Sequence, residues 1–249
     1  MPRSKKIKPR MPGIEAPPFE TDELRRMLKA FFDIVYDKPN AKKPRTIGGF
    51  KWGVYIFYDY DGEPIYVGQT KEKISQRIGR HLTNQRTDAV AMSVLDPFEV
   101  YRIRAYPLPQ FEHVNAKHRS YKRAKAYLNE LEYRIHRQAQ KQSSFKAILN
   151  EKDPVRSKAK IKVPRFVENV VVSKKVADLR KHADVRIARR AQVIARLAQT
   201  ISERQVKNGL RRTLVTQARR LSWLAQRRYS QLGGAALVEV GAEDSEILD

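Results

Sequence analysis

Apolar residues recur at two different spacings along this chain, and the change of spacing predicts the order of its elements. Helical spacing comes first, over residues 23–36, where Thr21 or Asp22 is placed to cap the helix. The apolar stripe of this helix consists of Leu24, Leu28, Phe31, Phe32 and Val35. Residues 1–20 are rich in Pro and Lys, so the first region, residues 1–48, is predicted to be a basic arm followed by this helix.

Strand spacing follows in two runs that flank Asp61-Gly62, a pair typical of a tight β-hairpin. With these two residues as the turn, Phe57 faces Tyr66 and Tyr55 faces Gly68. Side chains alternate along a strand, so one face carries Tyr55, Phe57, Tyr66 and Gly68, and the other carries Val54, Ile56, Ile65 and Val67. We expect the second face to pack on helices. The first face is expected to lie away from the core, with space over Gly68 beside two tyrosines.

The pattern then predicts a helix over residues 72–84, a third strand over residues 98–106 and a long helix over residues 117–140. Residues 154–173 are predicted to be a basic linker that contains a short β-prone run of valines. A basic helical region follows over residues 174–232, and residues 233–249 are predicted to form an acidic tail.

The basic helical region is predicted to be two helices, in the form of an antiparallel hairpin. Ile187, Ile194 and Ile201 repeat every seven residues along the first helix. Asn208-Gly209 marks the break between the helices. Beyond it the apolar stripe continues through Leu210, Leu214, Leu221 and Leu224.

Composition adds a strong positive charge to this picture. The 249 residues include 51 Lys and Arg against 27 Asp and Glu, which gives a net charge of +24. A nucleic-acid partner is the default interpretation of such a charge, and an anionic membrane surface is the alternative. The chain contains no cysteine, which excludes disulfides, thiolate zinc sites and cysteine nucleophiles. No apolar run is long enough to cross a bilayer and the N-terminus has no apolar signal region, so we expect a cytoplasmic protein.

Several motifs occur in a fixed order within residues 49–153. Gly53-Val54-Tyr55 is followed after ten residues by Tyr66-Val67-Gly68 and then by Gln69-Thr70. The later motifs are Arg77-x-x-x-His81 on a helix, Leu131-Glu132-x-x-Ile135 on a second helix, and Asn150. In this order and spacing, the motifs resemble the GIY-YIG nucleases.

The resemblance implies an α+β fold in which helices flank a small three-stranded antiparallel sheet. It also implies hydrolysis of DNA phosphodiesters with one Mg²⁺ or Mn²⁺ ion per site. In this role Arg77 would contact a phosphate oxygen and Glu132 would anchor the metal. Tyr55 would orient or deprotonate the attacking water, with His81 or Tyr66 as a proton relay, because a free tyrosine is a poor base. Asn150 would hold the phosphate or brace the site.

Two of these assignments have a rival nearby. Arg80 lies one turn after Arg77, and either arginine could be a solvated helix charge. Glu130 competes with Glu132, but residues two apart on a helix point about 200° from each other, so only one can face the site. The sequence context favours Glu132. Asn150 follows Glu132 at a greater distance than the family pattern leads us to expect.

Two basic stretches are candidates for contact with nucleic acid. The first begins the long helix and contains Lys117, Arg119, Lys122 and Arg123. The second is the C-terminal helical region, where the candidates are Arg189, Arg190, Arg211 and Arg212. A solvated face, or an amphipathic helical pair that forms a dimer contact, would explain the same residues without DNA.

The leading hypothesis is therefore a metal-dependent DNA endonuclease, of restriction type or from a mobile element, in a bacterial or phage-infected cell. Cutting both strands requires two sites and this chain has one copy of the motif, so we expect a homodimer. The competing hypothesis is a non-catalytic nucleic-acid-binding or architectural protein that uses the same fold. An RNA-binding protein is a third hypothesis, although the sequence contains no recognisable RNA-binding module.

Overall fold

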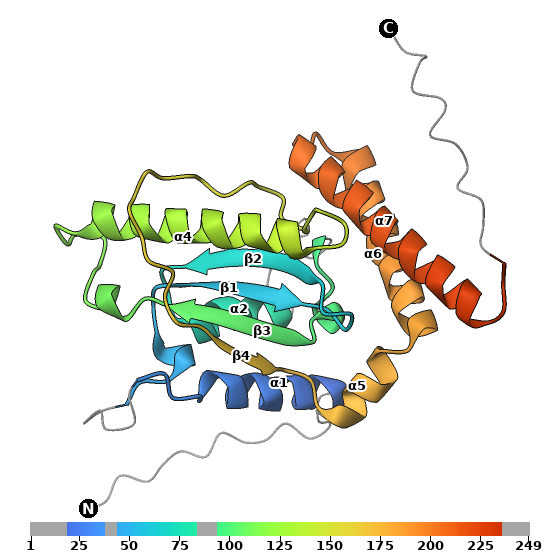
Figure 1. The fold of residues 1–249 in the computed structure, drawn as a ribbon, viewed down its shortest axis with the longest axis horizontal. Coiled ribbons are helices and arrows are strands. Elements are labelled where there is room, and N and C mark those ends of the chain that lie inside the picture. The colour runs from blue at the N-terminus through green and yellow to red at the C-terminus, as the bar shows by residue number, and fades with distance from the viewer. Residues whose placement is uncertain (1–18, 38–43, 84–93, 236–249) are drawn as a thin grey trace, which may run out of the picture.

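A four-stranded antiparallel sheet lies at the centre of the computed structural model, which describes residues 19–37, 44–83 and 94–235 (Figure 1). The strands are β1 (Gly53–Tyr58), β2 (Pro64–Thr70), β3 (Arg102–Pro107) and β4 (Val167–Val170), in the order β2-β1-β3-β4. The expected basic arm over residues 1–18 and the acidic end over residues 236–249 lie outside the described residues. The α+β class is confirmed.

The prediction of three strands was wrong by one, because β4 joins the sheet from the segment predicted as a linker. β4 pairs antiparallel with β3, and Glu168 accepts hydrogen bonds from Arg102 (2.8 Å) and Arg104 (2.6 Å) across the pair. Four residues are too few for an alternating pattern to stand out in a basic segment. This strand is therefore held in the sheet by its backbone pairing with β3 and by the two ion pairs of Glu168.

The β1–β2 hairpin has the predicted register. Phe57 lies opposite Tyr66 and Tyr55 lies opposite Gly68. The pairing shifts after Phe57, so that Tyr58 lies opposite Pro64, and Ile65 packs in the same cluster as Tyr55. The prediction that Ile65 shares the other face with Val54 was therefore wrong.

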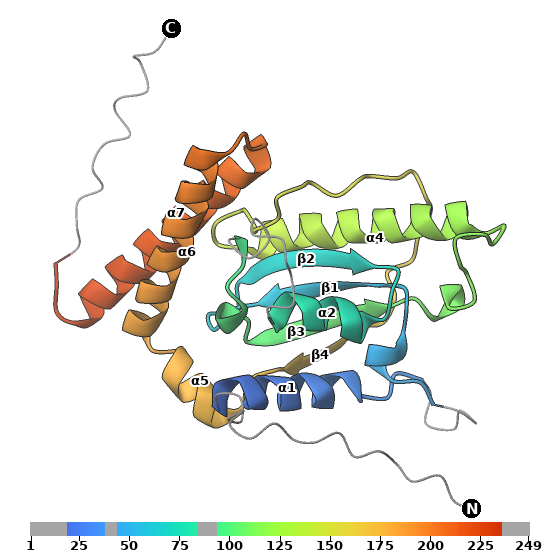
Figure 2. The ribbon, with the colours of Figure 1, turned by 180° about the vertical axis from the view of Figure 1, so that it is seen from behind.

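Helices cover both faces of the sheet (Figures 1 and 2). α4 (Tyr121–Gln142) packs on the face that carries Val54 and Ile56. The face that carries Tyr55 and Phe57 is covered by α1 (Phe19–Phe32) and α2 (Ile74–Leu82), through a set of apolar side chains that includes Leu24, Leu28, Phe31, Ile74 and Ile78. The tyrosine face was expected to lie away from the core, but Tyr55 and Phe57 are fully buried.

Three helices follow β4, namely α5 (Lys174–Arg180), α6 (Ala183–Glu203) and α7 (Asn208–Gln231). The expected pair corresponds to α6 and α7, which lie side by side (Figure 1). The buried face of α6 is not the stripe of isoleucines, which are only half-buried. It consists of Arg186, Arg190, Val193 and Leu197. None of the helices in the described part of the chain is both long and apolar enough to cross a membrane.

Two buried carboxylates explain why arginines occupy the inner face of α6. Asp59 at the end of β1 and Glu99 in the 3-10 turn Pro97–Glu99 are almost inaccessible to solvent. Arg190 donates to Glu99 (2.7 Å) and Asp59 (3.2 Å), and Arg220 of α7 donates to Asp59 (2.7 Å). Arg186 donates to Glu99 (3.3 Å). Burial acts to raise the pKa of Glu99, but these arginines lower that pKa below its ordinary value.

This buried ion cluster fixes α6 and α7 against the hairpin end of the sheet. Loss of one partner from a buried pair leaves an uncompensated charge, so Asp59→Asn is expected to lower the free energy of unfolding by about 3–5 kcal/mol. Asp178, in an exposed pair with Lys181, is the matched control, and its change to Asn is expected to cost less than about 1 kcal/mol. Urea denaturation of both variants measures the difference. Equal midpoints would show that the cluster is not stabilising.

Candidate functional site

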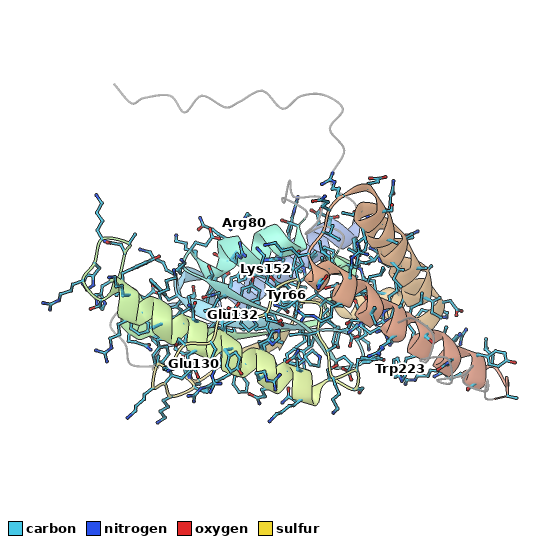
Figure 3. The ribbon with its side chains drawn as sticks, turned by 90° about the horizontal axis from the view of Figure 1, so that it is seen from above. Tyr66, Arg80, Glu130, Glu132, Lys152 and Trp223 are labelled. Carbon is cyan, nitrogen blue, oxygen red and sulfur yellow. The ribbon has the colours of Figure 1, made fainter. Side chains whose placement is uncertain are left out.

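A pocket of about 370 Å³ surrounds the outer edge of β2, the edge strand of the sheet. Five of the six predicted catalytic residues line it, namely Tyr66, Arg77, His81, Glu132 and Asn150. They come from both faces of the sheet, because α2 carries Arg77 and His81 while α4 carries Glu132. Side chains from opposite faces can meet only where the sheet ends. Tyr66 and Glu132 are labelled in Figure 3.

Tyr55, the sixth predicted residue, lies beneath this pocket in an aromatic cluster. Its ring centroid is 6.3 Å from that of Tyr66 and 6.0 Å from the His81 ring, and Tyr66 and His81 are 5.3 Å apart. Gly68 allows this packing, since a Cβ there would lie 2.5 Å from the Tyr55 hydroxyl oxygen and 2.9 Å from the Tyr66 ring. The space expected over Gly68 is therefore filled by the Tyr55 phenol.

The Tyr55 hydroxyl is held in its protonated form. Burial raises the pKa of Tyr55 well above its ordinary value, and the nearby Arg77 guanidinium only partly opposes this. Neither Tyr55 Oη nor Arg77 Nε has a hydrogen bond of good geometry among the described residues. The two side chains are not isolated, because Arg77 acts to lower the pKa of Tyr55 through its charge and a side-chain hydrogen bond, while Arg77 Nε remains a donor that a ligand could use.

Of the two rival carboxylates, Glu130 and Glu132, only Glu132 faces the pocket. Gln69 of β2 donates to Glu132 Oε2 (2.9 Å) and to Asn129 Oδ1 (3.2 Å), which fixes the carboxylate. Burial raises the pKa of Glu132 to about 7, and both Gln69 and Arg77 act in the opposite direction. Glu130 instead accepts bonds from Arg134 (2.9 Å) and the Ser157 amide (3.2 Å).

The two rival arginines, Arg77 and Arg80, also differ in whether they reach the pocket. Arg77 lines the pocket, whereas Arg80 forms an ion pair with Glu72, in which one bond measures 2.9 Å. Both side chains of this pair are more than one-third exposed to solvent. The spacing to His81 therefore identified the arginine that reaches the pocket, and Arg80 is a surface charge with its own partner.

The pocket residues fit a divalent metal ion that is bound mostly by water and substrate. Burial of the Glu132 carboxylate outweighs the opposing effects of Gln69 and Arg77 on its pKa, and a bound cation would supply further positive charge to it. Mg²⁺ commonly takes one or two carboxylates together with water and phosphate oxygens. The described residues include no cluster of three or more His, Cys, Asp or Glu that could form a closed metal cage. Glu132 is the residue placed to hold such an ion.

Asn150 braces the site through the backbone of β2. Its side-chain amide donates to the Val67 carbonyl (2.7 Å) and accepts from the Val67 amide (3.1 Å), and the neighbouring Leu149 amide donates to the Ile65 carbonyl (2.8 Å). Residues 149–150 thus continue the ladder on the free edge of β2. Of the two roles considered for Asn150, the geometry favours bracing over contact with a phosphate.

The residues predicted to bind nucleic acid divide into two groups. Lys117, Arg119, Lys122 and Arg123 are exposed around the start of α4, and Arg211 is exposed on α7. The other three have partners within the protein. Arg190 belongs to the buried ion cluster, so its assignment as a DNA contact is corrected. Arg189 pairs with Asp96 (2.8 Å) and stacks on Phe98, and Arg212 pairs with Asp153 (3.0 Å).

Among the polar residues that line the pocket, Gln69 and Lys152 were given no role from the sequence. Gln69 directly follows Gly68, and its position in the second motif was a signal that could have identified it. Lys152, labelled in Figure 3, lines the pocket with an exposed side chain. It follows Asn150 in an irregular segment, where no periodic pattern indicates which side chains face the site.

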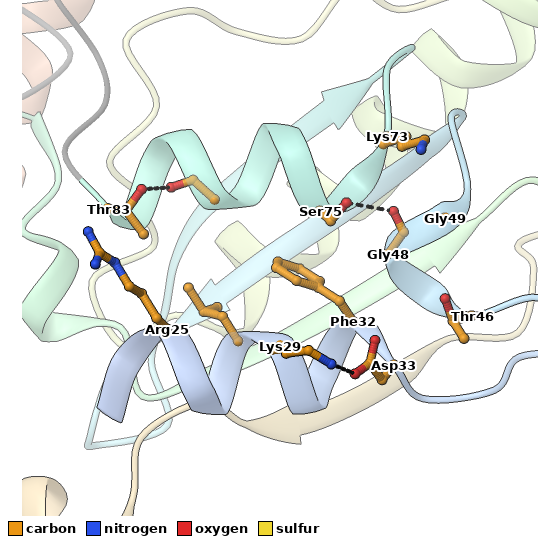
Figure 4. Close-up of a pocket in the computed structure, with 12 residues that line it drawn as sticks. Arg25, Lys29, Phe32, Asp33, Thr46, Gly48, Gly49, Lys73, Ser75 and Thr83 are labelled. Carbon is orange, nitrogen blue, oxygen red and sulfur yellow. Dashed lines mark hydrogen bonds and ion pairs between the residues drawn. The ribbon is translucent and has the colours of Figure 1, made fainter. Parts of the chain in front are cut away.

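A second pocket, of about 440 Å³, lies between α1 and α2 (Figure 4). It is lined by Arg25, Lys29, Phe32, Ser75 and Thr83, among others. Lys29 is paired with Asp33, and the Ser75 hydroxyl donates to the Gly48 carbonyl (2.8 Å). None of the predicted catalytic residues lines this pocket, so the candidate chemistry is at the edge of β2.

The raised pKa of Glu132 predicts how the metal-free protein responds to pH. Between its ordinary pKa of 4.5 and about 7, the folded state binds more protons than the unfolded state. The contribution of Glu132 to stability is therefore complete below pH 4.5 and is lost as the pH rises through 7. Glu132→Gln carries no charge, so it should be more stable than the parent at pH 8 by about 1–3 kcal/mol, and this gain should shrink at pH 5.

Urea denaturation in the presence of EDTA at pH 8 and pH 5 measures this gain. Glu203→Gln, at the exposed end of α6, is the control and should show no comparable dependence on pH. A Glu132→Gln protein that is no more stable than the parent at pH 8 would contradict the buried-charge interpretation.

The comparisons with known proteins give one match. Residues 51–110 match the family model described as the GIY-YIG catalytic domain. The matched region includes β1, β2, α2 and β3 and ends before α4. No curated protein and no solved structure matches the chain.

Proposed function

From the match of residues 51–110 to the GIY-YIG catalytic domain, we propose that this chain is a divalent-metal-dependent DNA endonuclease, of restriction type or from a mobile element. The observation that carries the proposal is the meeting of Tyr66, Arg77 and Glu132 around one edge-strand pocket, with the Tyr55 ring packed near that of Tyr66 beneath it. A phosphodiester gains negative charge as water attacks it, and this pocket offers a cation and a metal-binding carboxylate at that place.

Each residue has a chemically suitable role. The planar Arg77 guanidinium binds an equatorial phosphate oxygen, with its orphaned Nε as one donor. Glu132, fixed by Gln69, would hold the metal ion. Such an ion supplies positive charge to the leaving oxygen. Asn150 positions β2, which carries Tyr66 and Gly68, through its two hydrogen bonds to Val67.

Tyr55 orients the attacking water or the phosphate as a hydrogen-bond donor. Its raised pKa keeps the Tyr55 hydroxyl protonated near neutral pH, so Tyr55 is not available to take a proton from the attacking water. Tyr66 is more exposed than Tyr55 and lies against His81, so these two residues are better placed to pass a proton toward solvent. In the proposed mechanism, therefore, Tyr55 positions the reacting groups, and Tyr66 and His81 form the relay.

The exposed cations around the start of α4, together with Lys152 and Arg211, are proposed to bind the DNA backbone. Phosphate contacts of this kind position a protein on DNA without reading its sequence. The protein would accordingly be associated with DNA in the cell, where its positive charge favours binding.

Cleavage of supercoiled plasmid with Mg²⁺ or Mn²⁺ tests the proposed activity. Glu132→Gln should bind DNA but cut at least about 10²-fold more slowly than the parent, because the metal-binding charge is lost. Tyr55→Phe should also cut poorly, since the orienting donor is lost. Glu130→Gln is the matched control, because it makes the same change on the same helix at a residue that faces away from the pocket.

Equal cleavage rates for the Glu132→Gln variant and the parent would refute the metal assignment. A parent protein that binds plasmid but leaves it intact with either metal would favour the competing hypothesis of a non-catalytic nucleic-acid-binding protein.

We further propose that two copies act together on DNA, because the motif set occurs once and two strands must be cut. Cleavage of both strands should then rise more steeply than linearly with protein concentration. Sedimentation of the protein with a DNA duplex should show two protein chains per duplex. A complex that contains a single chain and still makes double-strand breaks would contradict this prediction.

A further inference from the structure

Helix α7 contacts two of the segments that line the candidate site. The first segment contains Asn150 and Asp153, and the second contains Val94. Both lie far from α7 in the sequence. The contacts come from three positions in the first three turns of this helix, which are Gly209, Arg212 and Gln217.

Arg212 binds the segment that follows Asn150 at two points. Its Nη1 donates to Asp153 Oδ2 (3.0 Å) and its Nη2 lies 3.4 Å from the Asn150 carbonyl oxygen. The pKa of Asp153 is lowered by this arginine, so the carboxylate is ionised and the contact is charge-assisted. Because the Asn150 side chain is bonded to Val67, Arg212 is connected through this segment to β2.

Gly209 brings the first turn of α7 against the same segment. A Cβ at this position would lie 1.7 Å from the Glu151 carbonyl oxygen, a distance that no real side chain could adopt. The obstructing atom belongs to the backbone, so a larger residue must displace either the segment or the helix. The contact therefore requires glycine for close approach.

Gln217 is the third residue of α7 in contact with a pocket-lining segment, and its partner is the segment that contains Val94. It is almost fully buried, and its Nε2 donates to the Val94 carbonyl oxygen (3.2 Å). Val94 itself lines the pocket. The buried ion cluster holds α7 in place, because Arg220 of this helix donates to Asp59.

We propose that α7 supports, from outside, the wall of the candidate site that residues 150–153 form, and that Arg212 is a positioning residue, which holds these residues where cleavage needs them. The consequence for cleavage rests on the proposed function, but the position of the segment does not. In this assignment, Arg212 acts within the protein rather than on a DNA phosphate.

Arg212→Ala tests the assignment in the full-length protein, with Arg219→Ala as the control. Both arginines are exposed on α7 and both changes remove one positive charge, but Arg219 lies two helical turns beyond Arg212. Amide hydrogen exchange over residues 149–155 should be faster in Arg212→Ala than in Arg219→Ala. The cleavage rate at saturating DNA should fall by about tenfold in Arg212→Ala, because misplacement of a supporting group costs catalysis, while DNA affinity matches that of the control.

Gly209→Ala provides a second variant that keeps the charge of the protein unchanged. It should increase exchange over residues 149–155 and slow cleavage, whereas Gly79→Ala, where a Cβ meets nothing within 4 Å, should do neither. Arg212→Lys should restore part of the Arg212→Ala loss, because an ammonium can bind Asp153 but lacks the fork that also reaches the Asn150 carbonyl.

Exchange over residues 149–155 that is the same in Arg212→Ala and Arg219→Ala would overturn the proposal. A loss of DNA affinity with unchanged cleavage at saturation would also overturn it, since Arg212 would then be a DNA contact. If the parent protein does not cleave DNA at all, the proposed function fails, and hydrogen exchange alone still decides whether α7 positions the segment.

Discussion

The structure depends on the requirement that buried charges find partners. Asp59 and Glu99 lie at the hairpin end of the sheet with almost no exposure to solvent, and their partners Arg186, Arg190 and Arg220 come from α6 and α7. A charge left unpaired in such a place is strongly destabilising, so the C-terminal helices must lie against the sheet in one arrangement. One of them, α7, then meets the segments that line the pocket at β2.

The candidate site combines residues that cannot meet across the middle of a covered sheet. Arg77 and His81 approach from one face and Glu132 from the other, and the edge of β2 is where they meet. Burial has the same effect on two ionisable groups of the site. It raises the pKa of both Tyr55 and Glu132, which favours the neutral, protonated form of each.

Much of the candidate site could be predicted because its geometry is local. The Asp61-Gly62 turn signal predicted which strand residues face each other, and the pairing of Tyr55 with Gly68 agrees with it, although the register shifts between Phe57 and the turn. Helical periodicity placed Arg77 and His81 on one face and separated Glu132 from Glu130. The nuclease family was predicted from these motifs, and the match over residues 51–110 confirmed it.

The sequence by itself therefore determined most of the helices and strands, the hairpin register as far as Phe57 and the spacing of the motifs, since each depends on residues within a turn or two of one another. The tertiary structure decided which surfaces are covered. It buried the tyrosine face, added β4 to the sheet and turned Arg190 inward to Glu99. The reason is that burial and ion pairing depend on partners far away in the sequence, and a basic helix has the same pattern whether its charges face carboxylates or water.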